Sequence, residues 1–330
     1  MRLPLLVCLA VALCATGCAA RRAERVVSEK ELLTPPKFLL EWGRKGTNAG
    51  EFTSPIGIAI GPRDELFVAE FNANRVQRFT PQGKFLGQFP VLKNPGGIAV
   101  DARGRCYVSS MTQHRVGVYE TSGQPVAEWG GKQGAADDEF YQPGGMVMGP
   151  DGAVWIADQG NHRVLRIAPE GKLRGKFGTH GSAPGQFGGA GSKGSRFGGP
   201  QFLAFDRQGN LYTTEAPGGR IQRLDVTGKP LAAWGDNSDA PGGFGGRVKP
   251  ERTPLPGPIA VWVDRLGRIW VSATNNRVQL FTPEGRYLLT LGGAGDGPGQ
   301  FRLPHGMATD SQGNIYVADA SNQRIQKFAP

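Results

Sequence analysis

A six-residue motif centred on an arginine occurs six times along this chain. The first copy is 74–79 (NRVQRF) and the last is 323–328 (QRIQKF). Consecutive motif arginines lie 40, 48, 57, 57 and 47 residues apart. Repetition at a period near 50 residues indicates equivalent structural units that bury their apolar faces against one another. The motif arginines are Arg75, Arg115, Arg163, Arg220, Arg277 and Arg324.

The same parts surround each arginine in the same order. A proline opens a first short strand (304–309 in the last repeat), a glycine turn leads to an alternating second strand (313–319), and the arginine strand is third. Four short antiparallel strands per repeat predict the blade of a β-propeller. An open solenoid is the alternative, but it needs capping repeats, which the sequence does not show. A turn glycine precedes each fourth strand, as at Gly83, Gly123, Gly171, Gly228 and Gly285.

The sixth repeat stops after its third strand, and the fourth strand is found near the other end of the chain. Residues 37–43 (KFLLEWG) match the fourth-strand segment 229–235 (KPLAAWG). We therefore expect an all-β, six-bladed ring in which the N-terminal strand closes the last blade. Such closure removes the open sheet edges that promote aggregation. Full burial of Phe38, Leu40 and Trp42, at roughly 1.5–3 kcal/mol each, would contribute about 5–8 kcal/mol at most.

The recurring pattern Gly-X-Phe, Pro-X-Gly-Ile-Ala, Leu-Tyr-Val-Ala-Asp, Asn-X-Arg-Ile-Gln-X-Phe resembles the NHL repeat. The resemblance covers residues 37–330 and depends on repetition of the whole pattern. It implies a six-bladed β-propeller with four antiparallel strands per blade. The fourth and fifth copies depart most, because 202–204 (FLA) and 259–261 (IAV) lack the glycine of the first strand.

The first residues are similar to a bacterial lipoprotein signal. The apolar stretch 3–15 is shorter than the ~20 residues that cross a bilayer as a helix, so we expect a cleaved signal peptide at 1–17. The segment 15–18 (ATGC) resembles a lipobox, which implies a lipid on Cys18; an ordinary secretory signal is the alternative. Residues 18–36 are then a lipidated tether. Ala19 after the cysteine, by the same resemblance, favours the outer membrane, with the domain facing the periplasm.

Charge and cysteine content narrow the possible partners. The chain has 38 Lys and Arg against 28 Asp and Glu, a net charge of +10. A basic chain suggests nucleic acid, but export argues against that partner and leaves anionic surfaces such as phosphorylated lipid headgroups or acidic glycans. Cys106 is the one cysteine in 37–330. We expect it to be a small buried hydrophobe, with no intramolecular disulfide.

An acid precedes four motif arginines at a fixed offset of five residues. Because the planar fork of arginine fits a carboxylate, we expect these pairs to brace the turn between the second and third strands. Ser110 and Ala273 replace the acid in repeats two and five, so Arg115 and Arg277 are candidates for contact with an anionic ligand. The four acids are Glu70, Asp158, Glu215 and Asp319.

Two insertions, 181–200 and 236–256, lengthen the links between blades. Propeller geometry places these links on one face of the ring, beside the turns between second and third strands, and we call this face the loop face. The loop face is the predicted binding site for a protein, peptide or anionic glycan. The alternative is that the two insertions are Gly-rich surface loops without a function. Phe244 also fits the Gly/Glu-X-Phe context of Phe52, Phe140, Phe187 and Phe301, which are expected to wedge between blades. The candidate residues are Lys193, Arg196, Phe197, Phe244, Arg247, Lys249 and Arg252.

The resemblance also implies an alternative function, because some similar propellers are enzymes. Amidating lyases hold zinc in the central channel through histidines just after the first-strand proline, and streptogramin lyases are more distant examples. Zinc needs about three protein ligands. One histidine occupies these positions here, so we expect no cofactor, although Gln201 and His305 are candidate channel residues. The positions are Ile56, Gly96, Gly144, Gln201, Ile259 and His305.

The other histidines occupy different repeat positions. His114 and His162 directly precede a motif arginine, so we expect them in turns. The sequence therefore favours a lipid-anchored binding or scaffold module over an enzyme. A metal-dependent lyase or hydrolase with its site in the channel is the alternative.

Overall fold

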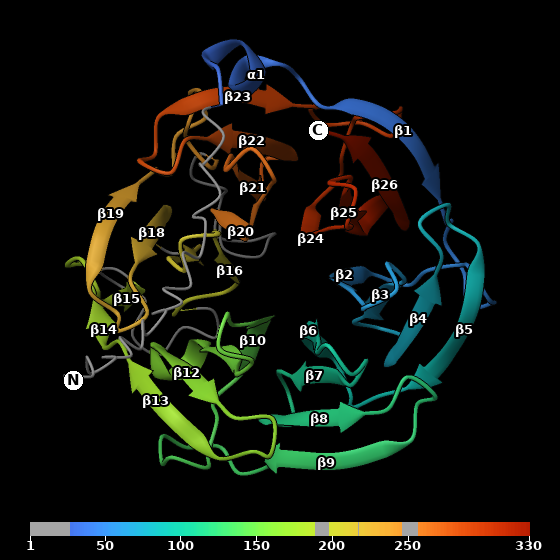
Figure 1. Ribbon diagram of the computed structural model, residues 1–330, viewed down its shortest axis with the longest axis vertical. Helices are drawn as coiled ribbons and strands as arrows, with labels where there is room; N and C mark the ends of the chain where they lie inside the picture. Colours follow the sequence, from blue (N-terminus) through green and yellow to red (C-terminus); the bar gives the residue numbers. More distant parts are fainter. Residues whose placement is uncertain (1–26, 189–197, 217, 246–256) are drawn as a thin grey trace, which may run out of the picture.

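Six four-stranded antiparallel sheets form a ring, the predicted β-propeller (Figure 1). The computed structural model describes residues 27–188, 198–216, 218–245 and 257–330. In each blade the first strand is innermost, and the fourth is outermost. Within these ranges no helix is long and apolar enough to cross a membrane.

The strands follow the repeat pattern along the chain. The first three blades contain β2 (Pro55–Ile60), β3 (Leu66–Glu70), β4 (Arg75–Phe79) and β5 (Phe85–Pro90); β6 (Pro95–Val100), β7 (Cys106–Ser110), β8 (Arg115–Tyr119) and β9 (Pro125–Gly130); β10 (Pro143–Met148), β11 (Val154–Asp158), β12 (Arg163–Ile167) and β13 (Leu173–Phe177). The last three contain β16 (Leu203–Phe205), β17 (Leu211–Glu215), β18 (Arg220–Leu224) and β19 (Pro230–Trp234); β20 (Pro258–Val263), β21 (Ile269–Ala273), β22 (Arg277–Phe281) and β23 (Tyr287–Leu291); β24 (Pro304–Thr309), β25 (Ile315–Asp319), β26 (Arg324–Ala329) and β1 (Lys37–Trp42). Outside the blades lie α1 (Glu29–Leu33), the short 3-10 turns η1 (Gln159–Asn161) and η2 (Ala320–Asn322), and the parallel pair β14 (His180–Gly181) and β15 (Phe187–Gly188).

The N-terminal strand closes the ring as predicted. β1 pairs antiparallel with β26, with Phe38 opposite Phe328 and Trp42 opposite Ile325. The expected gain from burial is too high, however. Phe38, Leu40 and Trp42 are only partly buried, because β1 is an outermost strand with one face in solvent. The closing strand therefore contributes less than the 5–8 kcal/mol expected for full burial.

A buried phenylalanine fills the space between each pair of blades where the sequence predicted a wedge. Phe52 is fully buried in a cluster that joins the first blade to residues of the last blade, such as Tyr316. The glycine that follows the preceding outer strand has a steric reason. Gly43 has φ of +100°, and a Cβ there would lie 2.4 Å from the Phe52 ring, so this position favours glycine. The wedge residues are Phe52, Phe140, Phe187, Phe244 and Phe301, each no more than 1% exposed.

Two predictions about single residues have clear outcomes. Phe244 belongs to the wedges, with its ring centroid 5.7 Å from that of Phe281, so the expectation that it is exposed on the loop face is wrong. Cys106 is fully buried in β7, as predicted, and burial raises the pKa of its thiol well above the usual range. Both side chains therefore belong to the core.

Candidate functional site

Four motif arginines are held by the acids that face them across the second and third strands. The register places each arginine directly opposite its acid. The prediction of a structural pair is confirmed for these four blades, and these guanidinium groups are not free to bind a ligand. The nitrogen–oxygen distances are 2.6 Å for Arg75–Glu70, 2.8 Å for Arg163–Asp158, 3.0 Å for Arg220–Glu215 and 2.8 Å for Arg324–Asp319.

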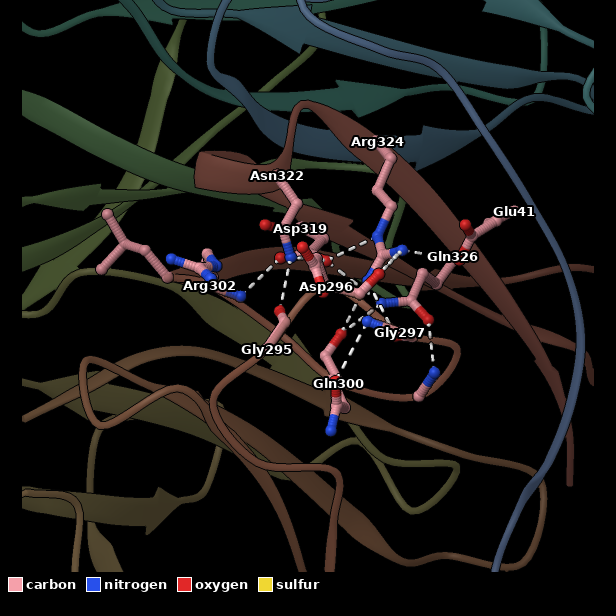
Figure 2. Close-up of polar contacts among 12 residues, drawn as sticks. Glu41, Gly295, Asp296, Gly297, Gln300, Arg302, Asp319, Asn322, Arg324 and Gln326 are labelled. Atoms are coloured by element: carbon pink, nitrogen blue, oxygen red, sulfur yellow. Dashed lines mark hydrogen bonds and ion pairs between the residues drawn. The ribbon is translucent and has the colours of Figure 1, made fainter.

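Figure 2 shows that Arg324 also fixes the link that precedes its blade. Its Nη2 donates to the carbonyl oxygens of Gly297 and Gln300, each at 3.0 Å. Its Nη1 donates to Glu41 on β1 at 2.8 Å, which ties the closing strand to the loop face. A buried arginine can satisfy its donors in this way because its fork reaches several acceptors at once.

The two arginines without a facing acid find other partners. Arg115 donates to Glu128 of β9 at 2.7 Å, so the expectation that it is free for an anionic ligand is wrong. Both side chains of this pair are partly exposed, and an anion would have to displace Glu128. Arg277 donates to the carbonyl oxygen of Asp239 at 2.9 Å, and no carboxylate among the described residues pairs with it. Arg277 is therefore the stronger candidate of the two.

The residue before each motif arginine adopts a left-handed conformation, and in four blades its side chain accepts a hydrogen bond from the backbone of the next blade. The Nδ1 of His114 accepts from the backbone of Gln142 at 3.1 Å, and Oε1 of Gln323 accepts from the backbone of Ser54 at 2.6 Å. The predicted turn role of His114 and His162 is thus confirmed. Burial lowers the pKa of both imidazoles. The six residues, with φ between +53° and +63°, are Asn74, His114, His162, Gly219, Asn276 and Gln323.

A cavity of about 220 Å³ opens at the loop-face end of the central channel, and we call it the upper cavity. The first strands of the blades and the residues after the second strands form its wall. Both predicted channel residues, Gln201 and His305, line it. The apolar wall residues include Ile56, Phe71, Met111, Phe202, Ile259 and Leu303, and the polar ones are Ser54, Gln159, Gln201, Thr274 and His305.

Two buried polar atoms in this wall lack a hydrogen-bond partner among the described residues. They are Oε1 of Gln159, whose side chain is 3% exposed, and Nδ1 of His305. Burial lowers the pKa of His305 to about 4, so the imidazole is neutral at pH 7. Because buried polar atoms are normally paired, these two atoms are available to a polar group of a ligand.

The sequence interpretation missed Phe71, Met111, Gln159 and Thr274, although a positional signal was present. Each of them directly follows the last residue of a second strand. The left-handed turn that comes next directs the chain back along the third strand, so this position meets the channel mouth. The two remaining blades have Ala216 and η2 residue Ala320 there, both buried.

The wall of the upper cavity does not fit a tetrahedral zinc ion. Zinc requires about three nitrogen, sulfur or carboxylate ligands, and the wall offers one imidazole and two amides. In the parts of the chain that the structure describes, no group of three His, Cys, Asp or Glu residues could hold a metal. The nearby acids are already paired with the motif arginines.

Most of the predicted loop-face residues fall outside the described ranges. The predicted lipidation residue, Cys18, also lies outside them. The loop-face candidates outside the described ranges are Lys193, Arg196, Phe197, Arg247, Lys249 and Arg252.

The sequence matches the family described as "NHL repeat" over residues 52–79, 140–167 and 301–328. Each match begins at a wedge phenylalanine and ends at the last residue of the arginine motif. Protein brain tumor of Drosophila melanogaster is 25% identical over 154 residues, which are 42% of this chain and 14% of that protein. Peptidyl-glycine alpha-amidating monooxygenase A of Xenopus laevis is 32% identical over 139 residues, which are 39% of this chain and 14% of that protein.

A solved structure, virginiamycin B lyase from Staphylococcus aureus, has the same fold. It aligns with a TM-score of 0.58 at 17% identity and covers 88% of this chain and 98% of the lyase. The chain spans a small part of the two relatives above and nearly the whole length of this lyase. At this identity the similarity concerns the fold alone.

Proposed function

Because this chain is a six-bladed β-propeller that carries NHL repeats, we propose that it is a binding module whose ligand site is the upper cavity. One observation carries the proposal. The cavity is an apolar recess at the channel mouth, and two buried polar atoms in it, of Gln159 and His305, have no hydrogen-bond partner in the described part of the chain. Apolar walls with a few convergent polar groups are typical of ligand sites.

The size of the cavity favours a peptide segment of a protein partner. A volume of about 220 Å³ is below the roughly 300–1,000 Å³ of sites that enclose a drug-sized ligand. It suits a single apolar side chain inserted from above, with a neighbouring peptide group bonded to Gln159 or His305. An anionic glycan has less support, because the wall residues that the structure describes carry no permanent positive charge and Arg277 is the described candidate for that contact.

The cellular setting belongs to the same proposal. The segment 15–18 supports export and attachment through a lipid on Cys18, and Ala19 supports the outer membrane facing the periplasm. Mass spectrometry of the N-terminal peptide from membranes tests this. An acylated Cys18 is expected, and a Cys18→Ser variant should leave the membrane fraction. An unmodified cysteine after cleavage at another site would contradict the anchor.

Site-specific photo-crosslinking on intact cells tests the binding site. A benzophenone amino acid at Thr274, in the wall of the upper cavity, should capture a discrete partner. The same probe at Leu231, exposed on β19, is the control. Filling the cavity with Met111→Trp should abolish the capture from position 274. Equal capture from both positions, or capture that survives the filled cavity, would contradict the proposal.

A lyase or hydrolase is the second candidate, favoured by the position of His305 in the channel wall. A neutral imidazole can act as a base, although the wall lacks the ligand set for zinc. Elemental analysis of the purified protein distinguishes the candidates. Stoichiometric zinc that is lost in His305→Ala would support the enzyme, and metal-free protein that still captures its partner would support the binding module.

A further inference from the structure

The central channel contains a second cavity, of about 400 Å³, on the face opposite to the loop face. We call it the lower cavity. Its wall is formed by the far ends of the first strands, such as Ile60 and Val100, and by the turns that follow them. Phe202 lines both cavities and therefore separates them. The lower cavity is thus independent of the binding site proposed above.

Phe202 can separate the cavities because four other blades carry glycine at its position. The first strands approach one another closely around the axis. A Cβ on Gly97 would lie 2.5 Å from the carbonyl oxygen of Gly144 in the next blade. Phe202 is the one large side chain at this position of the six first strands, and it lies between the two cavities. The equivalent residues are Gly57, Gly97, Gly145, Phe202, Ala260 and Gly306.

Methionine is concentrated along this channel. Met146, Met148 and Met307 line the lower cavity, and Met111 lines the upper one, which accounts for every methionine in the described residues. The blade cores elsewhere are built from Val, Ile, Leu and aromatic residues. Methionine side chains are flexible and polarisable, so they adapt to apolar ligands of different shapes. This distribution indicates an adaptable apolar wall.

An aromatic residue gives the lower cavity one rigid side. Trp262 lines the wall, and its indole Nε1 donates to Oγ1 of Thr309 at 2.6 Å. Apolar side chains of three core clusters pack against the same indole, which fixes its orientation. A flat apolar ligand can therefore stack on Trp262 while the methionines adjust around it.

The charge of the lower cavity is opposite to that of the whole protein. The chain has a net charge of +10, yet no Lys, Arg or His is found among the described residues of this wall, and both of its charged groups are carboxylates. Asp310 is 5% exposed, accepts from Tyr316 and Asn314, and is paired with the buried Lys327, whose Nζ lies 3.7 Å from its Oδ2. Asp64 is more exposed and accepts from the backbone N–H of Ser311 at 2.9 Å and from its hydroxyl. Asp64 is therefore the charge that a ligand meets.

We propose that the lower cavity binds a small hydrophobic amine. The apolar body would lie between Trp262 and the methionines, and the ammonium group would face the carboxylate of Asp64 at the rim. An anionic amphiphile such as a fatty acid finds no cation among the described residues of this wall, and its carboxylate would be repelled by Asp64. The proposal does not depend on the ligand of the loop face.

Three probes that share one ring system test the charge preference: 1-naphthylmethylamine, 1-naphthalenemethanol and 1-naphthoic acid. Calorimetric titration of the full chain should give at least tenfold tighter binding of the amine than of the acid, with the alcohol between them. Asp64→Asn should reduce amine binding to the level of the alcohol. Asparagine suits this position, where φ is +60°, and melting curves establish that each variant is folded.

Two filling variants locate the site. Val100→Trp, at the end of β6 in the lower wall, should abolish binding of the amine, whereas Met111→Trp in the upper cavity should leave it unchanged. Binding lost in Met111→Trp and kept in Val100→Trp would overturn the proposal. So would equal binding of all three probes, tighter binding of the acid, or no binding of the amine.

Discussion

At the scale of single residues, the same arginine in the same register has different partners in different blades. Arg324 is buried against Asp319 and three backbone carbonyls, whereas Arg115 reaches an exposed glutamate on the fourth strand. The offset of five residues predicted the first arrangement, because cross-strand neighbours follow from a short turn. It could not predict Glu128, whose position depends on the hairpin between β8 and β9.

This difference predicts unequal losses of stability. Arg324→Met leaves Asp319 charged, fully buried and without its main partner, and should lower the free energy of unfolding by about 3–5 kcal/mol. The matched variant Arg115→Met breaks an exposed pair and should cost at most about 1 kcal/mol. Urea unfolding of both variants measures the difference. Equal losses would mean that the facing acid does not matter.

His305 predicts a specific pH dependence. Folding lowers its pKa from the ordinary value near 6.5 to about 4. Above pH 6.5 neither state holds the proton. As the pH falls from 6.5 to 4, the unfolded chain binds the proton first, so the folded state loses about 3 kcal/mol of stability. His305→Gln should lack this loss. Denaturant titrations of both proteins over that range measure the free energy of unfolding at each pH. If this free energy fell equally with pH in both proteins, the burial of a neutral imidazole would be contradicted.

At the scale of elements, the fourth strand contacts the hairpin turn of the next blade at five of the six junctions between blades. The outer-strand aromatic Trp129 packs where a Cβ on Gly171 would lie, 2.6 Å from its Nε1. Trp42 makes the equivalent contact with Gly83, at 2.7 Å, across the closure of the ring. The sequence identified these glycines as turn residues. It did not show their contacts, because those join different blades.

Two glycine variants separate packing from backbone strain. Gly171 and Gly152 both have positive φ, +90° and +74°, but a Cβ on Gly152 meets nothing within 4 Å. Gly152→Ala should lower the free energy of unfolding by about 1–2 kcal/mol, because alanine is strained in a left-handed backbone conformation. Gly171→Ala should cost a further 1–3 kcal/mol, roughly, from displacement of Trp129. Thermal melts would contradict the contact between blades if the two variants had the same Tm.

At the scale of the whole molecule, repetition made the ring predictable and the cavities unpredictable. Six copies of four strands, counted around a circle, indicated the number of blades and the closing strand. The cavities depend on how closely the first strands approach the axis, which no single repeat encodes. His305 and Gln201 were identified by their repeat position, whereas the separating role of Phe202 is apparent only when all six first strands are placed around the axis.

Removal of the closing strand should affect the entire ring. Deletion of residues 37–43 exposes the edge of β26 and removes the bond between Arg324 and Glu41. Three half-buried apolar side chains are also lost. Together these changes should lower the free energy of unfolding by about 2–5 kcal/mol. We expect a lower Tm and association through the open edge, measured by calorimetry and light scattering. A monomer with unchanged Tm would contradict the role of β1.

Chemical crosslinking tests the closure of the ring most directly. Lys37 and Ala329 are opposite each other across β1 and β26. Lys172 directly precedes β13, which lies across the ring from β1 (Figure 1). Cys106 is buried and should not compete. A short bismaleimide should link Lys37→Cys to Ala329→Cys within one molecule and leave the pair Lys37→Cys and Lys172→Cys unlinked. Absence of the first link, or linkage only between molecules, would contradict a ring closed by its two ends.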